Sequence, residues 1–240
     1  MDSKSVCILH SNDLHGRLDL ALADRIAPHR ADCDLYFDSG DCIKAGNLAV
    51  PLRPEMVWSI LDSLKCTASV PGNRESHILK SAMEAKLAGH THPILCANLY
   101  EKGGARMLAP SLTLELNGLR IGVLGVMVPM VTDRMQSKAV SQLIWTQPIP
   151  EAVALASAMR PDCDLVVALT HIGFRQDQLL AEATPDIDLI LGGHSHTILE
   201  QPIKIQDTWI CQGGSHGRFL GRYVWTQGRG ITESQLLPLA

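Results

Sequence analysis

The sequence predicts an α/β protein with a single domain built on a βαβ-type sheet that is followed by antiparallel pieces. Short apolar runs alternate with longer amphipathic segments along the 240 residues, which is the pattern of βαβ units. Hydrophobic residues make up 46% of the chain, a globular composition rather than a disordered one. No internal repeat or low-complexity linker divides residues 1–240, so we expect one domain.

The strands are predicted from short runs rich in valine, isoleucine and leucine. Seven such runs are present, at residues 6–10, 34–38, 67–70, 93–97, 121–127, 164–169 and 187–191. The Asn117–Gly118 pair predicts a hairpin turn within residues 111–127. After residue 202 we expect more short strands joined by glycine-rich turns, and no helix.

The helices are predicted from the longer amphipathic segments between these strands. They are expected at residues 19–31, 53–64, 76–88, 150–159 and 175–183. Pro150 or Glu151 can open the fourth helix, and Pro161 closes it.

The composition argues against several kinds of partner. The net charge is −4 at pH 7 and no run of lysine or arginine occurs, so a large nucleic-acid interface is not expected. Aromatic residues make up only 4%, too few for a platform that stacks single-stranded bases. No segment approaches the ~20 apolar residues that span a bilayer, so no membrane association is expected. The sequence gives no indication of the oligomeric state.

The cysteines and the N-terminus predict a cytoplasmic protein. The seven cysteines are scattered and form no C-x-x-C pair. Several lie in apolar runs, Cys7 and Cys96 among them, so we expect buried free thiols in a reducing compartment. Residues 1–9 lack the layout of a signal peptide, because the apolar stretch is short and runs directly into a polar motif.

Polar side chains gather where five of the predicted strands end. These junctions read SNDLHGR, DSGDCI, PGNRES, LTHIGF and LGGHSHT. In α/β sheets, ligands bind beyond the carboxyl ends of the strands, so we expect the five junctions to meet. Together they supply seven oxygen or imidazole donors and no thiolate: Asp13, His15, Asp41, Asn73, His171, His194 and His196.

These seven donors predict a dinuclear metal site. Three or more histidines with carboxylates and an amide suit Mn²⁺, Fe, Zn²⁺, Co²⁺ or Ni²⁺ and are too rich in nitrogen for Ca²⁺. Seven ligands are too many for one tetrahedral ion, and Asp41 can bridge two ions because a carboxylate has two oxygens. Taken singly, SGD and GN are ordinary turn chemistry, GGHSH can be a polar turn, and a lone histidine such as His15 or His171 is more often structural than a ligand. The glycines among them are expected to let backbone segments approach closely, at positions 16, 40, 72, 192 and 193.

The ordered set D-x-H, G-D, G-N, H and G-H-x-H resembles the signature of the calcineurin-like metallophosphoesterases. ILHSNDLHGRL resembles the opening of their 5′-nucleotidase and cyclic-phosphodiesterase branch, and the motifs span residues 11–197. The resemblance implies a four-layer α/β/β/α sandwich with two divalent transition-metal ions, manganese being favoured. It also implies two ligand sets that share Asp41. One set is Asp13, His15, Asp41 and His196, and the other is Asp41, Asn73, His171 and His194.

The segment GNRESH departs from the family pattern at two positions. The family reads G-N-H-E, where the histidine contacts phosphate and assists the leaving group, and Arg74 stands here instead. In the nucleotidase branch an aspartate orients that histidine, and His77 stands at its position. Arg74 can neutralise phosphate charge, but a guanidinium cannot donate a proton. We therefore expect Asn73 and Arg74 to bind substrate, with Arg74 and His77 as the candidate catalytic residues.

Two functions follow from these residues. The first is a dinuclear metal-dependent phosphohydrolase acting on a small phosphomonoester, phosphodiester or pyrophosphate substrate, nucleotide-like ones included. The alternative is a metal-binding relative with weak or no catalysis and a non-enzymatic role. The full donor set favours the enzyme, and the altered His–Asp pair favours the relative. The sequence ends at Ala240, near the expected end of the metal-bearing domain, so we expect no C-terminal nucleotide-binding domain.

Overall fold

A computed structural model describes residues 4–239 and confirms a mixed α/β fold. Residues 1–3, at the start of the segment in which no signal peptide is expected, and residue 240 lie outside the described part. Within it, the strands form a five-stranded sheet of order β13-β12-β1-β2-β3 and a six-stranded sheet of order β10-β11-β9-β8-β6-β5. The apolar pattern alone predicted one βαβ-type sheet, which is wrong because the predicted strands divide between two; the sandwich implied by the family resemblance also has two β layers.

The five-stranded sheet joins the N-terminal strands to the C-terminal hairpin. β1 pairs in parallel with β2 and antiparallel with β12, and β2 pairs in parallel with β3. The carboxyl ends of β1, β2 and β3 therefore face the same edge of the sheet. The five strands are β1 (Ser5–Ser11), β2 (Leu35–Asp38), β3 (Ala68–Ser69), β12 (Phe219–Thr226) and β13 (Gly230–Pro238).

The six-stranded sheet has a parallel centre and a hairpin at each edge. β6, β8, β9 and β11 run in parallel. The predicted hairpin is confirmed: Asn117 and Gly118 join β5 to β6 with φ angles of 52° and 72°. The strands are β5 (Ser111–Leu116), β6 (Leu119–Met127), β8 (Leu165–His171), β9 (Leu189–Gly192), β10 (Ile203–Ile205) and β11 (Thr208–Cys211).

Outside these sheets, β4 (Leu99–Glu101) pairs with β7 (Leu143–Trp145). The strand predicted at residues 93–97 is absent from the described structure, where Ile94 and Leu95 make only isolated bridges. The strands after residue 202 include two longer ones than expected, β12 and β13, and no helix lies among them.

All five predicted helices are present. α1 begins one residue later than predicted, α2 begins later because Glu55 is its N-cap residue, and α3 because the preceding residues belong to a polar loop. The prediction that Pro150 or Glu151 opens the fourth helix is wrong, because α4 begins at Pro148 after the N-cap residue Gln147. None of the helices between residues 4 and 239 has both the length and the apolar character needed to cross a bilayer. The helices are α1 (Leu20–Ala31), α2 (Met56–Ser63), α3 (Lys80–Leu87), α4 (Pro148–Met159) and α5 (Phe174–Ala183), with short 3₁₀ turns at Gln136–Ala139 and Arg160–Asp162.

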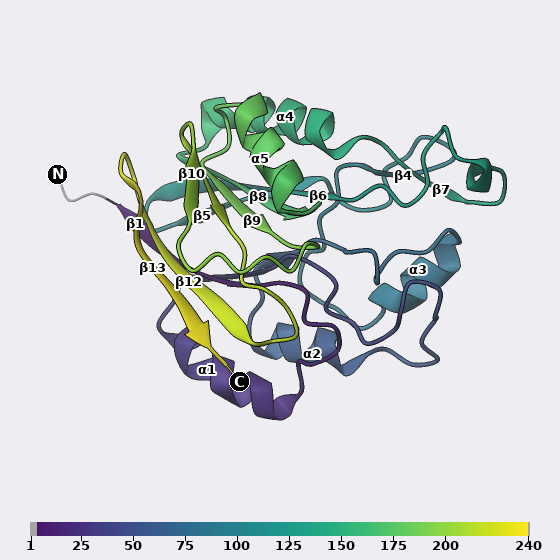
Figure 1. Cartoon of the computed structure of the whole chain (residues 1–240), viewed down its shortest axis with the longest axis horizontal. Coiled ribbons are helices and arrows are strands. Elements are labelled where there is room, and N and C mark those ends of the chain that lie inside the picture. Colours follow the sequence, from purple (N-terminus) through teal and green to yellow (C-terminus); the bar gives the residue numbers. More distant parts are fainter. Residues whose placement is uncertain (1–3, 240) are drawn as a thin grey trace.

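The core explains how the helices are placed. In Figure 1, α4 and α5 cover the six-stranded sheet, whereas α1 and α2 lie beyond the five-stranded sheet. Alternate residues of β8 are buried on opposite faces of its sheet. Leu165, Val167 and Leu169 belong to the core shared with the other sheet. Val166 and Ala168 pack with α4 and α5, as expected of a parallel strand buried on both faces.

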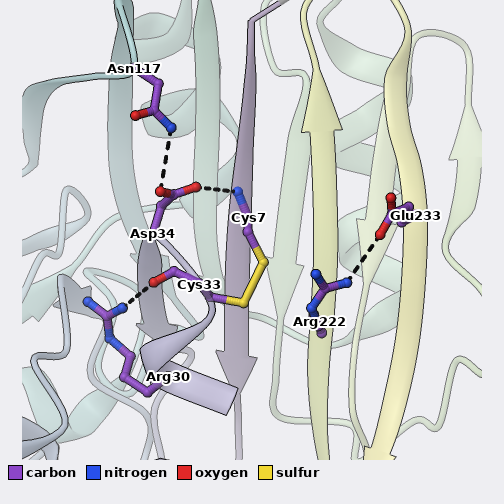
Figure 2. Close-up of a disulfide and its surroundings, with 7 residues drawn as sticks. All are labelled: Cys7, Arg30, Cys33, Asp34, Asn117, Arg222 and Glu233. Atoms are coloured by element: carbon purple, nitrogen blue, oxygen red, sulfur yellow. Dashed lines mark hydrogen bonds and ion pairs between the residues drawn. A yellow bond between two sulfur atoms is a disulfide. The ribbon is translucent and has the colours of Figure 1, made fainter. Parts of the chain in front are cut away.

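Cys7 and Cys33 form a disulfide, so the prediction that all cysteines are free thiols is wrong for this pair (Figure 2). Cys7 lies on β1 and Cys33 just precedes β2, and their Cα atoms are 4.8 Å apart because these strands are neighbours. The other five cysteines are free and buried, as expected. Next to the disulfide, the Asp34 carboxylate accepts hydrogen bonds from the Cys7 amide and the Asn117 side chain, and so links the two sheets.

Candidate metal centre

The seven predicted donors lie together at one end of the two sheets. Loops after β1, β2, β3 and β9 carry six of them, and His171 is the last residue of β8. Their side chains form two neighbouring groups with Asp13 and Asp41 between them. Ligand atoms of Asp13, His15 and His196 lie within 4.8 Å of one another, and so do those of Asp13, Asp41 and His171.

The first group contains two histidines and two carboxylates. Nε2 of His15 lies 3.1 Å from Nε2 of His196. Nε2 of His196 lies 3.2 Å from Oδ1 of Asp13, and Oδ2 of Asp41 lies 3.7 Å from Nε2 of His15. Three of these donors, Asp13, His15 and His196, thus surround one small space as they would around a single ion, and Asp41 approaches it from the side of His15.

The second group contains two histidines, the amide and the same aspartate. Nε2 of His171 lies 3.6 Å from Oδ1 of Asp41 and 3.4 Å from Oδ1 of Asn73. That amide oxygen is also 3.0 Å from Nδ1 of His194. Asp41 therefore turns a different oxygen toward each group, which is the placement required of a bridging ligand.

A buried oxygen of Asp13 indicates whether metal ions fit these residues. Oδ1 of Asp13 is buried and has no hydrogen-bond partner among residues 4–239. An unpaired buried carboxylate oxygen is costly, and a cation between this oxygen and the two histidines would pair it. Nitrogen and oxygen donors of this kind suit borderline transition-metal ions. The residues present therefore fit divalent metal ions.

Five of the seven donors have left-handed backbone conformations. Such conformations are rare for residues other than glycine, cost of order 1–3 kcal/mol each and cluster at functional sites. Hydrogen bonds between loops hold them: the Asp13 amide donates to the Gly40 carbonyl at 2.9 Å and the His15 amide to the Asp41 carbonyl at 2.8 Å. The φ angles are 51° for Asp13, 51° for His15, 54° for Asp41, 75° for His194 and 54° for His196.

Neighbouring polar groups orient the donors. Nδ1 of His171 donates to the Ser39 carbonyl at 2.6 Å, which leaves Nε2 free to face Asp41. Oδ2 of Asp13 accepts from the Asn12 side chain at 2.7 Å and from the His194 amide at 2.9 Å. Only Oδ1 of this carboxylate is then directed at the first group.

Glu75, to which the sequence analysis assigned no role, organises the Asp41 loop. Its fully buried carboxylate accepts backbone hydrogen bonds from both loops that meet at Asp41. Burial, together with the charge of Glu75, raises the pKa of Asp41 to about 6. The donors to Glu75 are the amides of Asp41 at 2.9 Å, Cys42 at 3.0 Å, Ile43 at 3.1 Å and Gly72 at 2.7 Å.

Close approach is confirmed at all five predicted glycines, since an added Cβ atom would lie within 3.0 Å of another atom at each, and two of them show it best. A Cβ atom at Gly72 would overlap the Asp41 carboxylate. A Cβ atom at Gly193 would lie 2.6 Å from the Ser39 carbonyl oxygen and 3.2 Å from Oδ2 of Asp13. Larger residues at these positions would displace the donors.

Arg74 lies beside the donors, and the side chains of Arg74 and His77 are both engaged elsewhere. The Arg74 amide donates to Oδ1 of Asp41 at 2.7 Å, while its guanidinium donates to the Lys44 carbonyl at 3.0 Å. Nδ1 of His77 accepts from the Leu79 amide at 3.0 Å. Burial, and next the charge of Lys86, lowers the pKa of His77. Their catalytic roles stay predictions.

His216 belongs to the site and was missed by the sequence analysis. Its ring stacks on His15 with centroids 4.7 Å apart and an interplanar angle of 11°, and it lies 5.8 Å from the His196 ring. Its φ angle is 60°, and its amide donates to the Asp13 carbonyl at 2.7 Å. It follows β11 in the turn GGSHGR, outside the five junctions, so the order of motifs carried no signal for it.

Solved structures share this fold. The chain is similar to a 5′-nucleotidase precursor of Thermus thermophilus with a TM-score of 0.76 and 20% identity, covering 98% of this chain and 54% of that one. It is also similar to the calcineurin-like phosphoesterase YfkN of Bacillus subtilis, with a TM-score of 0.79 and 20% identity over 99% and 91% of the two chains.

Curated relatives are similar in sequence. The metallophosphoesterase YunD of Bacillus subtilis is 28% identical over 232 residues, which cover 89% of this chain and 48% of that protein. Human 5′-nucleotidase is 26% identical over 225 residues, which cover 80% and 38%. The chain thus spans about half the length of these relatives or less. The model of calcineurin-like phosphoesterases matches residues 7–197, and the chain therefore belongs to the calcineurin-like phosphoesterase family.

Proposed function

We propose that this protein is a dinuclear metal-dependent phosphohydrolase that acts on small phosphorylated substrates. The observation that carries the proposal is the placement of Asp41, whose Oδ2 faces His15 at 3.7 Å and whose Oδ1 faces His171 at 3.6 Å. A carboxylate shared by two donor groups suits a pair of metal ions. When bound, such a pair supplies Lewis acidity and charge neutralisation for phosphoryl transfer.

Two sets of residues would hold the ions. Asp13, His15, Asp41 and His196 are the proposed ligands of one ion, and Asp41, Asn73, His171 and His194 those of the other. Manganese is the proposed metal among the transition metals that such donors accept. We also propose that the two sheets and their outer helices form the four-layer α/β/β/α sandwich of metallophosphoesterases.

Arg74 and Asn73 are the proposed contacts to substrate. The Arg74 guanidinium uses one nitrogen on the Lys44 carbonyl and retains other N–H groups that can donate to phosphate oxygens. The Asn73 amide nitrogen donates to the Asn47 side chain at 3.1 Å, which directs its oxygen toward the histidines. His77 is the second candidate catalytic residue.

The proposed substrates are phosphomonoesters, phosphodiesters or pyrophosphates, including nucleotide-like ones. The support is family membership together with relatives named 5′-nucleotidase and apyrase. The alternative, a non-catalytic metal-binding protein, is less favoured. Folding does not require five strained, converging donors, whereas a functional site does. A cytoplasmic location stays a prediction, and the Cys7–Cys33 disulfide removes part of the thiol argument for it.

A turnover assay on a metal-counted sample tests the proposal. The protein would be purified without chelator, reconstituted with Mn²⁺ and assayed with an aryl phosphate and with pyrophosphate. We expect metal-dependent hydrolysis that is lost in Asp41→Ala. Bound metal without hydrolysis of either substrate class would support the non-catalytic alternative, and failure to bind any metal would exclude both.

A further inference from the structure

Lys86 is a fully buried lysine close to the candidate metal centre. It lies near the end of α3, and its ammonium group contacts backbone carbonyl oxygens rather than a carboxylate. The four acceptors are the carbonyls of Arg74 at 2.6 Å, Gly46 at 2.9 Å, Asn47 at 2.9 Å and Ser76 at 3.2 Å.

A lysine in this position is unusual. Lysine is almost never fully buried, because removing its charge from water is costly. Four charge-assisted hydrogen bonds can offset that cost only if the carbonyls are held in place around the nitrogen. The ammonium group and the backbone segments around it therefore fix each other.

The four carbonyls come from two separate parts of the chain, segment 44–47 and loop 71–76. Two further hydrogen bonds join the same segments, from the Asn73 side chain to Asn47 and from the Arg74 guanidinium to the Lys44 carbonyl. The Glu55 carboxylate anchors the start of the first segment by accepting from the Lys44 amide at 2.6 Å and the Ala45 amide at 2.7 Å. Lys86 is the point where both segments meet.

We propose that Lys86 is a positioning residue that locks segment 44–47 onto loop 71–76 and so fixes the Asn73 side chain. With its amide nitrogen held by Asn47, the Asn73 oxygen points at His171 and His194, 3.4 and 3.0 Å away. The inference that this matters for a metal ion rests on the proposed function. The locking of the two segments does not.

The four carbonyls around the Lys86 ammonium group also allow a chemical test. If Lys86 acts through its ammonium group, a small cation that fits among the carbonyl oxygens should replace it when the side chain is shortened. Ammonium in solution has the same donor groups, whereas tetramethylammonium has the charge without any N–H donor. A packing role of the lysine stem would respond to neither ion.

The experiment measures hydrogen exchange of the metal-free protein. In Lys86→Met, the hydrogen-bonded amides of Ala45 and Arg74 should lose protection about tenfold, as for one lost charge-assisted hydrogen bond. The hydrogen-bonded amides of Asp13, His15 and Gly16 should stay protected. Lys86→Ala should lose the same protection and regain it with ammonium chloride but not with tetramethylammonium chloride. Lys80→Met, on the surface of the same helix, is the matched control and should change neither segment.

Metal titration gives the second readout. Lys86→Met should weaken one of two binding steps about tenfold and spare the other, because only the Asn73 group loses its support. Unchanged protection of the Ala45 and Arg74 amides, or an equal loss at Asp13, His15 and Gly16, would overturn the proposal. If Lys86→Met does not fold, Lys86→Gln replaces it, with the same expected pattern. Since exchange is read without metal or substrate, this outcome is independent of whether the protein hydrolyses phosphate esters.

Discussion

The Nε2 atoms of His15 and His196 lie 3.1 Å apart, although 181 positions separate the two residues along the chain. Both nitrogens face Oδ1 of Asp13, at 3.7 and 3.2 Å. That oxygen is buried without a hydrogen-bond partner in the described part of the chain. Loops from both sheets thus bring three donor atoms to one point, and the geometry is explained if a cation occupies it.

Asp41→Ala should be the most damaging ligand substitution, because it removes one oxygen from each donor group. We expect the metal content of protein reconstituted with Mn²⁺ to fall from about two equivalents to less than one, since both proposed ions lose a ligand. Elemental analysis after desalting measures this. Asp207→Ala, an exposed aspartate beside Lys204, is the control. Retention of two equivalents by Asp41→Ala would contradict the bridging role.

Gly72→Ala should disturb the same carboxylate without changing any donor. The added Cβ would overlap Asp41, so loop 71–76 or the carboxylate must move. We expect weaker metal binding and, as for small-to-large changes at packed positions, a loss of about 1–3 kcal/mol in the free energy of unfolding. Chemical denaturation and metal titration measure the two effects. Gly103→Ala, where a Cβ meets no atom within 4 Å, should be neutral; equal behaviour of the two variants would refute the steric argument.

Asp177 should make the stability depend on pH. It is fully buried, its Oδ1 accepts from the Thr170 hydroxyl at 2.6 Å, and its Oδ2 is without a partner among the residues described. Burial raises its pKa from 3.8 to about 8. Between these values the native state holds a proton that the unfolded chain releases. The free energy of unfolding should therefore fall as pH rises from about 4 to about 8, by up to about 1.4 kcal/mol per pH unit.

Asp177→Asn tests this dependence. The amide keeps an oxygen for Thr170 and cannot ionise, so the fall in stability across that pH range should become shallower. Urea unfolding of metal-free protein at several pH values measures the slope. Asp207→Asn, at an exposed position, should leave the slope unchanged. An unchanged slope in Asp177→Asn would show that Asp177 is already ionised in the native state across this pH range.

Local sequence patterns predicted the helices and most strands because amphipathic segments alternate with short apolar runs. The helix starts were less predictable, because among the described α-helices only α1 has an N-cap side chain that accepts a hydrogen bond. The hairpin at Asn117 was predictable because only that turn type needs two positive φ angles. Local patterns did not predict the division into two sheets, because it depends on which strands become neighbours over long distances; only the family resemblance implied two β layers. The Cys7–Cys33 pair is such a case: 26 positions separate the cysteines, and only the pairing of β1 with β2 brings them together.

The donors of the candidate site could be listed from the sequence because they follow strand ends in a recurring order. The residues that hold the donors in place could not be predicted from the sequence. Lys86 lies in a helix where a lysine ordinarily faces water, and nothing local indicates four carbonyls around it. His216 follows a strand that carries no recognisable donor motif. Another segment, GHTHP, has the same G-H-x-H order as residues 193–196. There, however, His92 pairs with Asp62 and Ser69, away from the donors.

His216 should support His15 through stacking. Replacing His216 with alanine removes the ring that lies 4.7 Å from the His15 ring. Since such contacts contribute about 0.5–1.5 kcal/mol, we expect metal affinity of the first group to weaken about 2- to 10-fold. His216→Phe keeps a ring in place and should retain the affinity. If both variants bind metal as the wild type does, while both lose activity, His216 contacts substrate instead of orienting His15.

Arg74 should make the reaction depend strongly on the leaving group. Its guanidinium supplies fixed positive charge at a position where the family has a histidine, and it cannot donate a proton. General acid catalysis typically contributes about 10²- to 10⁴-fold, which matters most for alkyl leaving groups. We therefore expect aryl phosphates and pyrophosphate to be hydrolysed well and alkyl monoesters poorly. A series of phosphate esters with increasing leaving-group pKa measures this slope.

The decisive variant restores the histidine and the aspartate of the family pattern at positions 74 and 77. His77 now accepts a hydrogen bond from the Leu79 amide, so Arg74→His combined with His77→Asp should supply an acid and the carboxylate that orients it. We expect this double variant to flatten the slope by raising kcat/KM for alkyl monoesters. Arg74→Met, which removes the charge without adding an acid, is the control and should lower kcat/KM for all substrates similarly. If the wild type instead shows a shallow slope, and His77→Ala selectively loses alkyl substrates, then His77 is the proton donor and the assignment of Arg74 is wrong.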